Sequence, residues 1–216
     1  MDWISANVQK SHYRRRKGWA WTAATDVKIT GGTARGIVLR APAQKTVRPA
    51  TDRTREAVFS RLGAGIAGAC FLDLFAGTGA YGLEALSRGA LGGEFVETDR
   101  RAIAFLKRNL AAVSKSLGGL EAGGECRVST VDVLKWRSLP GVKFDLVFAD
   151  PPYSWLRTHG IEVFEIAAAA MDRDAGGLLI FEMPGEHEII AEGWELERRL
   201  GKRGRGEPSV AFFRLH

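Results

Sequence analysis

The sequence of 216 residues has few cysteines and no long apolar run. Its two cysteines, Cys70 and Cys126, are far apart and form neither a CxxC nor a zinc-binding pattern. We expect both to be buried free thiols, and we expect no metal site. No apolar stretch approaches the roughly 18 residues of a membrane-spanning helix, and the N-terminus lacks the apolar core of a signal peptide. The sequence therefore predicts a cytoplasmic protein without a membrane segment.

Acidic residues are scarce in the N-terminal part of the chain. Residues 1–61 hold 13 Lys and Arg but 4 Asp and Glu, a net charge of +9, whereas the remainder has a net charge of −3. Such an asymmetry favours a polyanionic partner. Within residues 1–26, the basic run Arg14, Arg15 and Arg16 lies close to two tryptophans, and this mixture can bind phosphates and stack on unpaired bases. A solvated tail is the alternative interpretation.

Strand and helix patterns alternate from residue 69 onward. Apolar runs predict strands at 70–74, 93–97, 126–131, 144–149 and 177–181, and helical spacing predicts helices near 79–88, 100–115 and 158–171. Repeated units of this kind are typical of an α/β fold with a doubly wound, mostly parallel sheet. The ligand site of such a sheet lies at the carboxyl ends of its strands.

Both ends of the chain carry further strand patterns. Residues 27–40 alternate around two glycines, which predicts a β-hairpin. Thr51 has the side chain of an N-cap for a helix that runs to about Leu62. The tail, at about residues 194–215, predicts two antiparallel strands around a basic turn. Because Pro208 lacks the N–H of a strand interior, we expect it at a sheet edge.

A glycine-rich loop follows the first strand of the predicted sheet. Gly77, Gly79 and Gly82 satisfy a fingerprint that brings a ligand against the backbone at a helix N-terminus. Alone, this pattern fits a nicotinamide- or flavin-dependent enzyme as well as a methyltransferase. Asp73 at the strand end favours the second, because its carboxylate would repel a pyrophosphate and attract the ammonium group of S-adenosylmethionine.

Carboxylates also follow the next two strands. Glu97, 18 residues after Gly79, can accept hydrogen bonds from both ribose hydroxyls of the cofactor. Asp132 can accept from the adenine amino group. The structural alternatives are a helix cap for Asp73, a surface position for Glu97 and a turn for Asp132, while Asp99 more readily caps the next helix than binds ribose. We assign the remaining cofactor contacts to Phe75, Thr78 and Val133.

The fourth strand ends in a second motif, which consists of Asp150, Pro151, Pro152 and Tyr153. An aryl amine is a poor nucleophile because its lone pair is delocalised into the ring. The carboxylate of Asp150 and the carbonyl of Pro151 can each accept one amine N–H, which orients the nitrogen and helps remove its proton. The prolines hold the loop extended, and the ring of Tyr153 can stack on a base. The motif predicts methylation of an exocyclic amine, with a capped turn as the structural alternative.

Together, these motifs resemble the bacterial 16S rRNA (guanine-N(2))-methyltransferase family. The resemblance runs from about Lys28 to Glu182, and its most specific parts are residues 29–36 and Arg48–Phe59. It implies a seven-stranded, Rossmann-like class I methyltransferase sheet with an N-terminal β-hairpin. It also implies S-adenosylmethionine as the cofactor and the 2-amino group of one 16S rRNA guanine as the acceptor. The implied partner is an assembling or assembled small ribosomal subunit, and the implied state is a monomer.

The resemblance also suggests how the chain is divided. We expect residues 27–62, the hairpin and helix, to face RNA, residues 63–216 to form the catalytic domain, and residues 1–26 to be an extension. The candidate RNA contacts are Arg14, Arg15, Arg16, Arg35, Arg48, Arg53 and Arg55. For Arg53 and Arg55, contact with a ligand and pairing with acidic neighbours in the helix are both open.

Three other functions explain part of the pattern. Loops like Asp150–Tyr153 also serve DNA adenine and protein glutamine amines, and no residue separates guanine from adenine by chemistry alone. An NAD-dependent oxidoreductase explains the glycine loop but leaves the second motif unused. A catalytically silent RNA-binding protein explains the basic N-terminal part and leaves both motifs unused.

Overall fold

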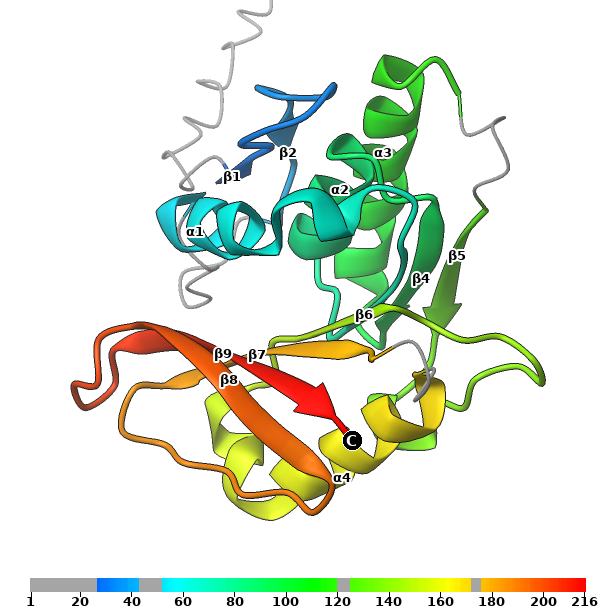
Figure 1. Cartoon of the computed structure of the whole chain (residues 1–216). Coiled ribbons are helices and arrows are strands. Elements are labelled where there is room, and N and C mark those ends of the chain that lie inside the picture. The colour runs from blue at the N-terminus through cyan, green and yellow to red at the C-terminus, as the bar shows by residue number, and fades with distance from the viewer. Residues whose placement is uncertain (1–26, 43–51, 120–124, 172–175) are drawn as a thin grey trace, which may run out of the picture.

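The computed structural model describes residues 27–42, 52–119, 125–171 and 176–216 of the chain (Figure 1). The predicted extension, residues 1–26, lies outside these ranges. Within them, the chain forms a small N-terminal hairpin and one large sheet with helices on both faces.

The large sheet has seven strands in the order β5-β4-β3-β6-β7-β9-β8 within the described ranges. Their bounds are β3 (Cys70–Leu74), β4 (Gly92–Glu97), β5 (Cys126–Thr130), β6 (Leu146–Ala149), β7 (Leu178–Pro184), β8 (Trp194–Gly201) and β9 (Pro208–Leu215). The strands from β5 to β7 are parallel, and β9 runs antiparallel to both β7 and β8. This topology confirms the predicted doubly wound, mostly parallel α/β fold.

Helices cover both faces of this sheet (Figure 1). On one face lie α1 (Asp52–Leu62), α2 (Ala80–Ser87) and α3 (Arg100–Ser116), and on the other lies α4 (Leu156–Ala170). The strands between them are apolar on both sides, as a doubly covered sheet requires. None of the helices in the described ranges is long and apolar enough to cross a membrane.

Side chains of β6 and β7 alternate between two apolar cores. Phe148 and Ile180 belong to the core beneath α1 and α2. Ala149 and Phe181 belong to the core beneath α4. Because strand side chains alternate between faces, even-numbered positions of these two strands face α1 and α2.

The predicted N-terminal hairpin is present, with strands shorter than expected. Strands β1 (Val27–Lys28) and β2 (Val38–Leu39) pair antiparallel. The loop between them gives its backbone donors to α2: the Thr33 N–H bonds the Ser87 carbonyl at 2.8 Å, and the Ala34 N–H bonds the Ser87 hydroxyl at 2.9 Å. Two further backbone bonds continue the hairpin beyond these strands, from the Ile29 N–H to the Ile37 carbonyl at 3.0 Å and from the Gly36 N–H to the Ile29 carbonyl at 2.9 Å.

Glu84 of α2 anchors this hairpin and α1 to the sheet. Its fully buried carboxylate accepts hydrogen bonds from the Thr30 N–H at 2.8 Å, the Thr30 hydroxyl at 2.7 Å and the Gly31 N–H at 2.9 Å. It also pairs with Arg88 at 2.8 Å and with Arg55 of α1 at 3.5 Å. One buried charge therefore connects three segments that are distant in sequence.

Two expectations need correction. Pro208 does not lie in an edge strand, because β9 runs between β7 and β8. It is the first residue of β9, opposite Pro184 at the end of the ladder, where a missing N–H costs little. Cys70 and Cys126 are free, as expected, but are half-buried rather than buried.

The anchoring role of Glu84 predicts a large stability loss on its removal. We expect Glu84→Gln to lower the free energy of unfolding by about 3–5 kcal/mol, because Arg55 would lose a buried counter-charge. Urea unfolding should show a lower midpoint with an unchanged slope. Glu165→Gln is the matched control on an exposed position of α4 and should stay within about 0.5 kcal/mol of wild type. Equal midpoints for the two variants would contradict the anchoring role.

Candidate active site at the carboxyl ends of the parallel strands

Acidic side chains gather where four adjacent parallel strands end. Asp73 lies in β3, Glu97 ends β4, Asp150 follows β6 and Glu182 lies in β7. Leu74 pairs with Ala149, and Ala149 pairs with Phe181, so these ends are in register. The fold therefore brings the two predicted motifs together, although more than seventy positions separate them in sequence.

Asp73 is buried in β3, beside the first turn of α2. Its side chain accepts a hydrogen bond from the Gly82 N–H at 2.9 Å, which is the helix-cap role foreseen as its structural alternative. Burial raises the pKa of the Asp73 carboxyl to about 7; the bond from Gly82 lowers it, and the charges of Asp150 and Glu97 raise it further. The cap uses Oδ2, which leaves Oδ1 for another donor.

The glycine loop forms a narrow backbone cradle. Gly77 and Gly79 have φ angles of 55° and 89°, in the left-handed region. A Cβ on Gly79 would lie 2.4 Å from a methyl carbon of Leu106, and one on Gly82 would lie 2.4 Å from the ring of Phe95. Phe75 also has a positive φ, of 60°. A strained aromatic residue of this kind costs about 1–3 kcal/mol and is typical of ligand-binding sites.

Glu97 holds this loop to the end of β4. Its Oε2 accepts from the Gly77 N–H at 2.8 Å, and its Oε1 accepts from the Thr98 and Asp99 N–H groups at 2.7 and 2.8 Å. Asp99 itself caps α3 by accepting from the Arg101 N–H at 2.7 Å, as its alternative reading expected. Glu97 is half-buried, and these three backbone bonds fix the orientation of its carboxylate, which distinguishes it from a solvated surface carboxylate.

The other candidate cofactor residues adjoin the same edge. Asp132 accepts from the Leu134 N–H at 3.0 Å, so it has the turn-forming role foreseen as its alternative. Val133 packs its side chain into the core beneath α4. Thr78 lies in the cradle, where its carbonyl accepts from the Asn109 amide at 3.0 Å.

The second motif forms a short, partly open loop. Asp150 is half-buried, and burial raises the pKa of its carboxyl to about 7. Pro151 is buried, and Pro152 accepts from the Trp155 N–H at 2.7 Å to close a 3₁₀ turn, η3 (Tyr153–Trp155). Tyr153 is 40% exposed. This loop thus presents a carboxyl group and an accessible aromatic ring at the same strand end.

Three neighbours of the site did not emerge from sequence analysis. The ring of Trp155 lies 5.7 Å from that of Phe75, nearly perpendicular to it. The hydroxyl of Tyr81 donates to Glu182 at 3.1 Å, and both side chains are buried. A glutamate inside an otherwise apolar strand run was a signal available from the sequence, since such residues are rarely buried without a partner.

The structure separates the candidate RNA contacts into three groups. Arg35 and Arg53 are exposed. Arg55 is fully buried, where it pairs with Asp52 at 2.8 Å and with Glu84, so the structure favours the pairing alternative over an RNA contact. It pairs with Glu84 rather than the exposed Glu56, because it points under α1. The remaining candidates, Arg14, Arg15, Arg16 and Arg48, lie outside the described residues, as does Thr51.

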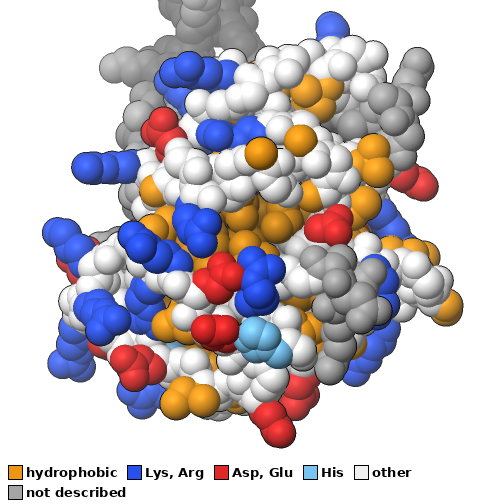
Figure 2. All heavy atoms as spheres, viewed as in Figure 1, with side chains coloured by type: hydrophobic (Ala, Val, Ile, Leu, Met, Phe, Trp, Pro, Cys, Tyr) orange, Lys and Arg blue, Asp and Glu red, His pale blue; other side chains and the backbone are white. Residues whose placement is uncertain are grey.

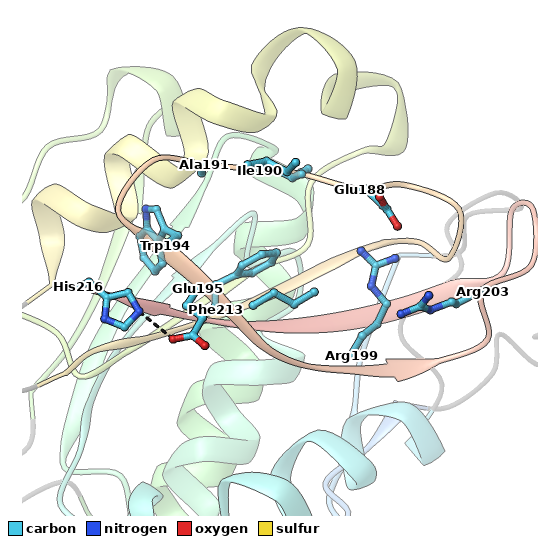
Figure 3. A pocket seen from close by; sticks show the side chains of 11 residues that line it. Glu188, Ile190, Ala191, Trp194, Glu195, Arg199, Arg203, Phe213 and His216 are labelled. Atoms are coloured by element: carbon cyan, nitrogen blue, oxygen red, sulfur yellow. Dashed lines mark hydrogen bonds and ion pairs between the residues drawn. The ribbon is translucent and has the colours of Figure 1, made fainter.

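Two hollows lie away from this edge. One, of about 570 Å³, is covered by the loop after β7 and lined by Trp194, Leu196 and Phe213 among others (Figure 3). The other, of about 450 Å³, lies between α1 and β8 and opens on the face in Figure 2. Its lining includes Leu146 and Leu178, the first residues of β6 and β7, so it lies at the opposite end of the strands. Neither hollow is lined by a predicted catalytic residue. Among the described residues, no cluster of His, Cys, Asp and Glu could hold a metal ion.

Comparisons with known proteins agree with this arrangement. The "Ribosomal RNA small subunit methyltransferase D" of Escherichia coli K12 is 39% identical over 127 residues, which cover 59% of this chain and 60% of that protein. The protein of the same name from Haemophilus influenzae is 37% identical over 132 residues, covering 61% and 66%. These alignments thus span less than two thirds of either relative.

A solved structure covers more of the chain. The E. coli protein named "Putative methyltransferase yhhF" superposes with a TM-score of 0.71 at 30% identity, over 88% of this chain and 98% of that one. This likeness confirms the Rossmann-like class I methyltransferase fold. The profile of the family described as "Conserved hypothetical protein 95" matches residues 27–214, which is nearly the whole described chain. The chain therefore belongs to the Conserved hypothetical protein 95 family.

Proposed function

We propose that this chain is an enzyme that transfers a methyl group from S-adenosylmethionine to the 2-amino group of a specific guanine in 16S rRNA. The observation that carries the proposal is the placement of the Asp150–Tyr153 loop beside the glycine cradle, at the ends of adjacent strands. The relatives named as small-subunit rRNA methyltransferases support the choice of substrate.

The cradle has the donors and acceptors that the cofactor needs. Asp73 would bind the ammonium group through its remaining oxygen, and Asp132 would accept from the adenine amino group. Phe75 and Thr78 would line the same cradle, and Val133, whose side chain packs into the core beneath α4, would contact the cofactor through its backbone. Bound S-adenosylmethionine would supply an electrophilic methyl group on its sulfonium centre.

The ribose imposes a condition on Glu97. A carboxylate has about four lone-pair sites, and three backbone N–H groups already occupy sites on Glu97. Two ribose hydroxyls therefore require at least one N–H to leave. The Gly77 N–H is the natural one, because it belongs to the cradle and would then face the ligand.

The second motif would prepare the amine. Asp150 would accept one N–H, and the Pro151 carbonyl the other, so that the nitrogen lone pair points at the methyl group. Tyr153 would stack on the base through its exposed ring. As the N–C bond forms and the S–C bond breaks, the surplus amine proton would pass to the ionised Asp150 carboxylate.

The basic residues would hold the RNA. Arg35 and Arg53 are exposed on the hairpin loop and on α1, in the segment 27–62 that we propose to face RNA. Residues 1–26 and Arg48 would add to this surface, and residues 63–216 would carry the chemistry. The proposed partner is the small ribosomal subunit in the cytoplasm, and the proposed state is a monomer. The guanine must leave its stack to reach Asp150.

Methyl transfer to three kinds of acceptor tests this function. The purified chain with radiolabelled S-adenosylmethionine should label small ribosomal subunits that lack the modification, and should leave DNA and release factors unlabelled. Asp150→Asn should lower this labelling by at least about 100-fold, because it cannot take the amine proton. It should still bind S-adenosylhomocysteine within about threefold of wild type. Label in DNA or release factors alone, or full activity of Asp150→Asn, would contradict the proposal.

The raised pKa of Asp150 predicts the pH dependence of the chemical step. Only the ionised carboxylate can accept the amine proton, so the single-turnover rate should fall as pH drops through about 7. Cofactor affinity should weaken over the same range, because protonation neutralises Asp73, and Asp73→Asn should remove that dependence. Rates measured at saturating cofactor separate the two effects. A rate that is constant from pH 6 to 8.5 would show that Asp150 does not titrate in the reaction.

A further inference from the structure

Glu182 lies beside Asp150, but the proposed methyl transfer does not use it. The last rung between β6 and β7 pairs Ala149 with Phe181, and Asp150 and Glu182 are the next residues of the two strands. Neighbouring strands are about 4.8 Å apart. Both residues also continue the even-numbered positions, whose side chains face α1 and α2. The register therefore places two carboxyl groups side by side on one face.

Tyr81 fixes the orientation of Glu182. Its hydroxyl donates to Glu182 Oε2 at 3.1 Å, and its ring stacks on Phe148 with centroids 5.4 Å apart and planes 20° apart. Burial and the charges of Glu182 and Asp150 raise the pKa of Tyr81 well above 10, so the phenol remains a donor. Glu182 Oε1 forms no hydrogen bond with the described part of the chain.

The electrostatic surroundings of Glu182 favour a ligand with hydrogen-bond donors. Burial, and next the charge of Asp150, raise the pKa of the Glu182 carboxyl to about 8, while the bond from Tyr81 lowers it. Asp73 and Glu97 add negative charge at the same edge, and Arg55, the buried cation beneath α1, is already paired. A base that brings two adjacent N–H donors would offset the repulsion between two ionised carboxylates.

Guanine and adenine differ in the atom beside their exocyclic amine. In guanine, ring nitrogen N1 carries a hydrogen next to the 2-amino group, so two donors point the same way. In adenine, the N1 next to the 6-amino group is an acceptor, and above pH 8 it would face the ionised carboxylate of Glu182 without a hydrogen between them. A buried acceptor adjacent to the amine site thus distinguishes the two bases.

We propose that Glu182, oriented by Tyr81, accepts the N1–H of the target guanine while Asp150 accepts from its 2-amino group. This inference rests on the proposed function and deepens it, because it names the residue that selects guanine. Glu182 would touch the base and take no part in moving the methyl group. Its removal should therefore change base preference more than cofactor binding.

The test compares small ribosomal subunits that carry guanine or adenine at the methylated position. Measured above pH 8, where Glu182 is ionised, wild type should prefer guanine by at least about 100-fold in single-turnover rate. Glu182→Gln should slow guanine methylation about 10- to 100-fold, the usual effect of losing a hydrogen bond to a charged group. Glu182→Gln should also lower the ratio of the guanine rate to the adenine rate at least tenfold, since the new amide can donate to adenine N1. Affinity for S-adenosylhomocysteine should stay within about threefold.

Two further variants make the result specific. Glu94→Gln is the matched control: Glu94 is also buried, but it accepts from Ser129 at 2.6 Å and Trp136 at 2.7 Å in another part of the sheet. It should leave the ratio unchanged even if it lowers stability. Tyr81→Phe keeps the ring and frees Glu182, so it should narrow the ratio about threefold or more. If Glu182→Gln fails to fold, the rate ratio of Tyr81→Phe tests whether Glu182 selects guanine.

Each outcome separates this inference from the proposed function. Wild-type activity on guanine with an unchanged ratio in Glu182→Gln, or in Tyr81→Phe when the first variant does not fold, would overturn the role of Glu182 alone. A wild type that methylates neither base would overturn the proposed function and the inference with it. A ratio that narrows equally in Glu94→Gln would show a general loss of packing and would also overturn the inference.

Discussion

The crowding of acidic groups at one edge of the sheet is the constraint on which this site depends. Strand register places Asp73, Asp150 and Glu182 at neighbouring strand ends, where burial raises the pKa of each carboxyl to about 7 or 8. Such an arrangement is unfavourable in the absence of cations or N–H donors. It is suited to a ligand with an ammonium and a sulfonium group, and to a base with amine hydrogens. The same repulsion that destabilises the edge would therefore contribute to binding.

A second buried charge connects the hairpin and α1 to this edge. Glu84 ties the hairpin loop and α1 to α2, and α2 begins at the cradle that Asp73 caps. The exposed Arg35 and Arg53 therefore lie on a surface that these buried bonds fasten to the helix starting at the glycine cradle. An RNA held by that surface would be positioned relative to Asp150 without a hinge between them.

The fold could be predicted closely from the sequence because its strongest signals are local. The apolar run of β6 and the spacing of Ile103, Leu106 and Val113 in α3 each reflect burial of the element itself. The cradle glycines were recognisable for the same reason. By contrast, Glu84 lies 29 positions from Arg55 and 54 positions from Thr30, and only the packed fold brings these residues together. Tyr81 and Glu182 are 101 positions apart, so their contact carried no sequence signal. The predicted edge position of Pro208 was wrong. A proline at the first residue of a strand leaves few ladder hydrogen bonds unmade, so it can occur in a strand that is paired on both sides.

Methylation of one guanine amine in 16S rRNA can be tested by mapping that modification in cells. Small-subunit rRNA from a strain that lacks the gene should be compared with rRNA from the parent strain by mass spectrometry of nuclease fragments. We expect that one N2-methylguanine is lost, and that the wild-type gene restores it whereas an Asp150→Asn gene does not. Identical rRNA modification in the two strains, or a loss confined to a base other than guanine, would contradict it.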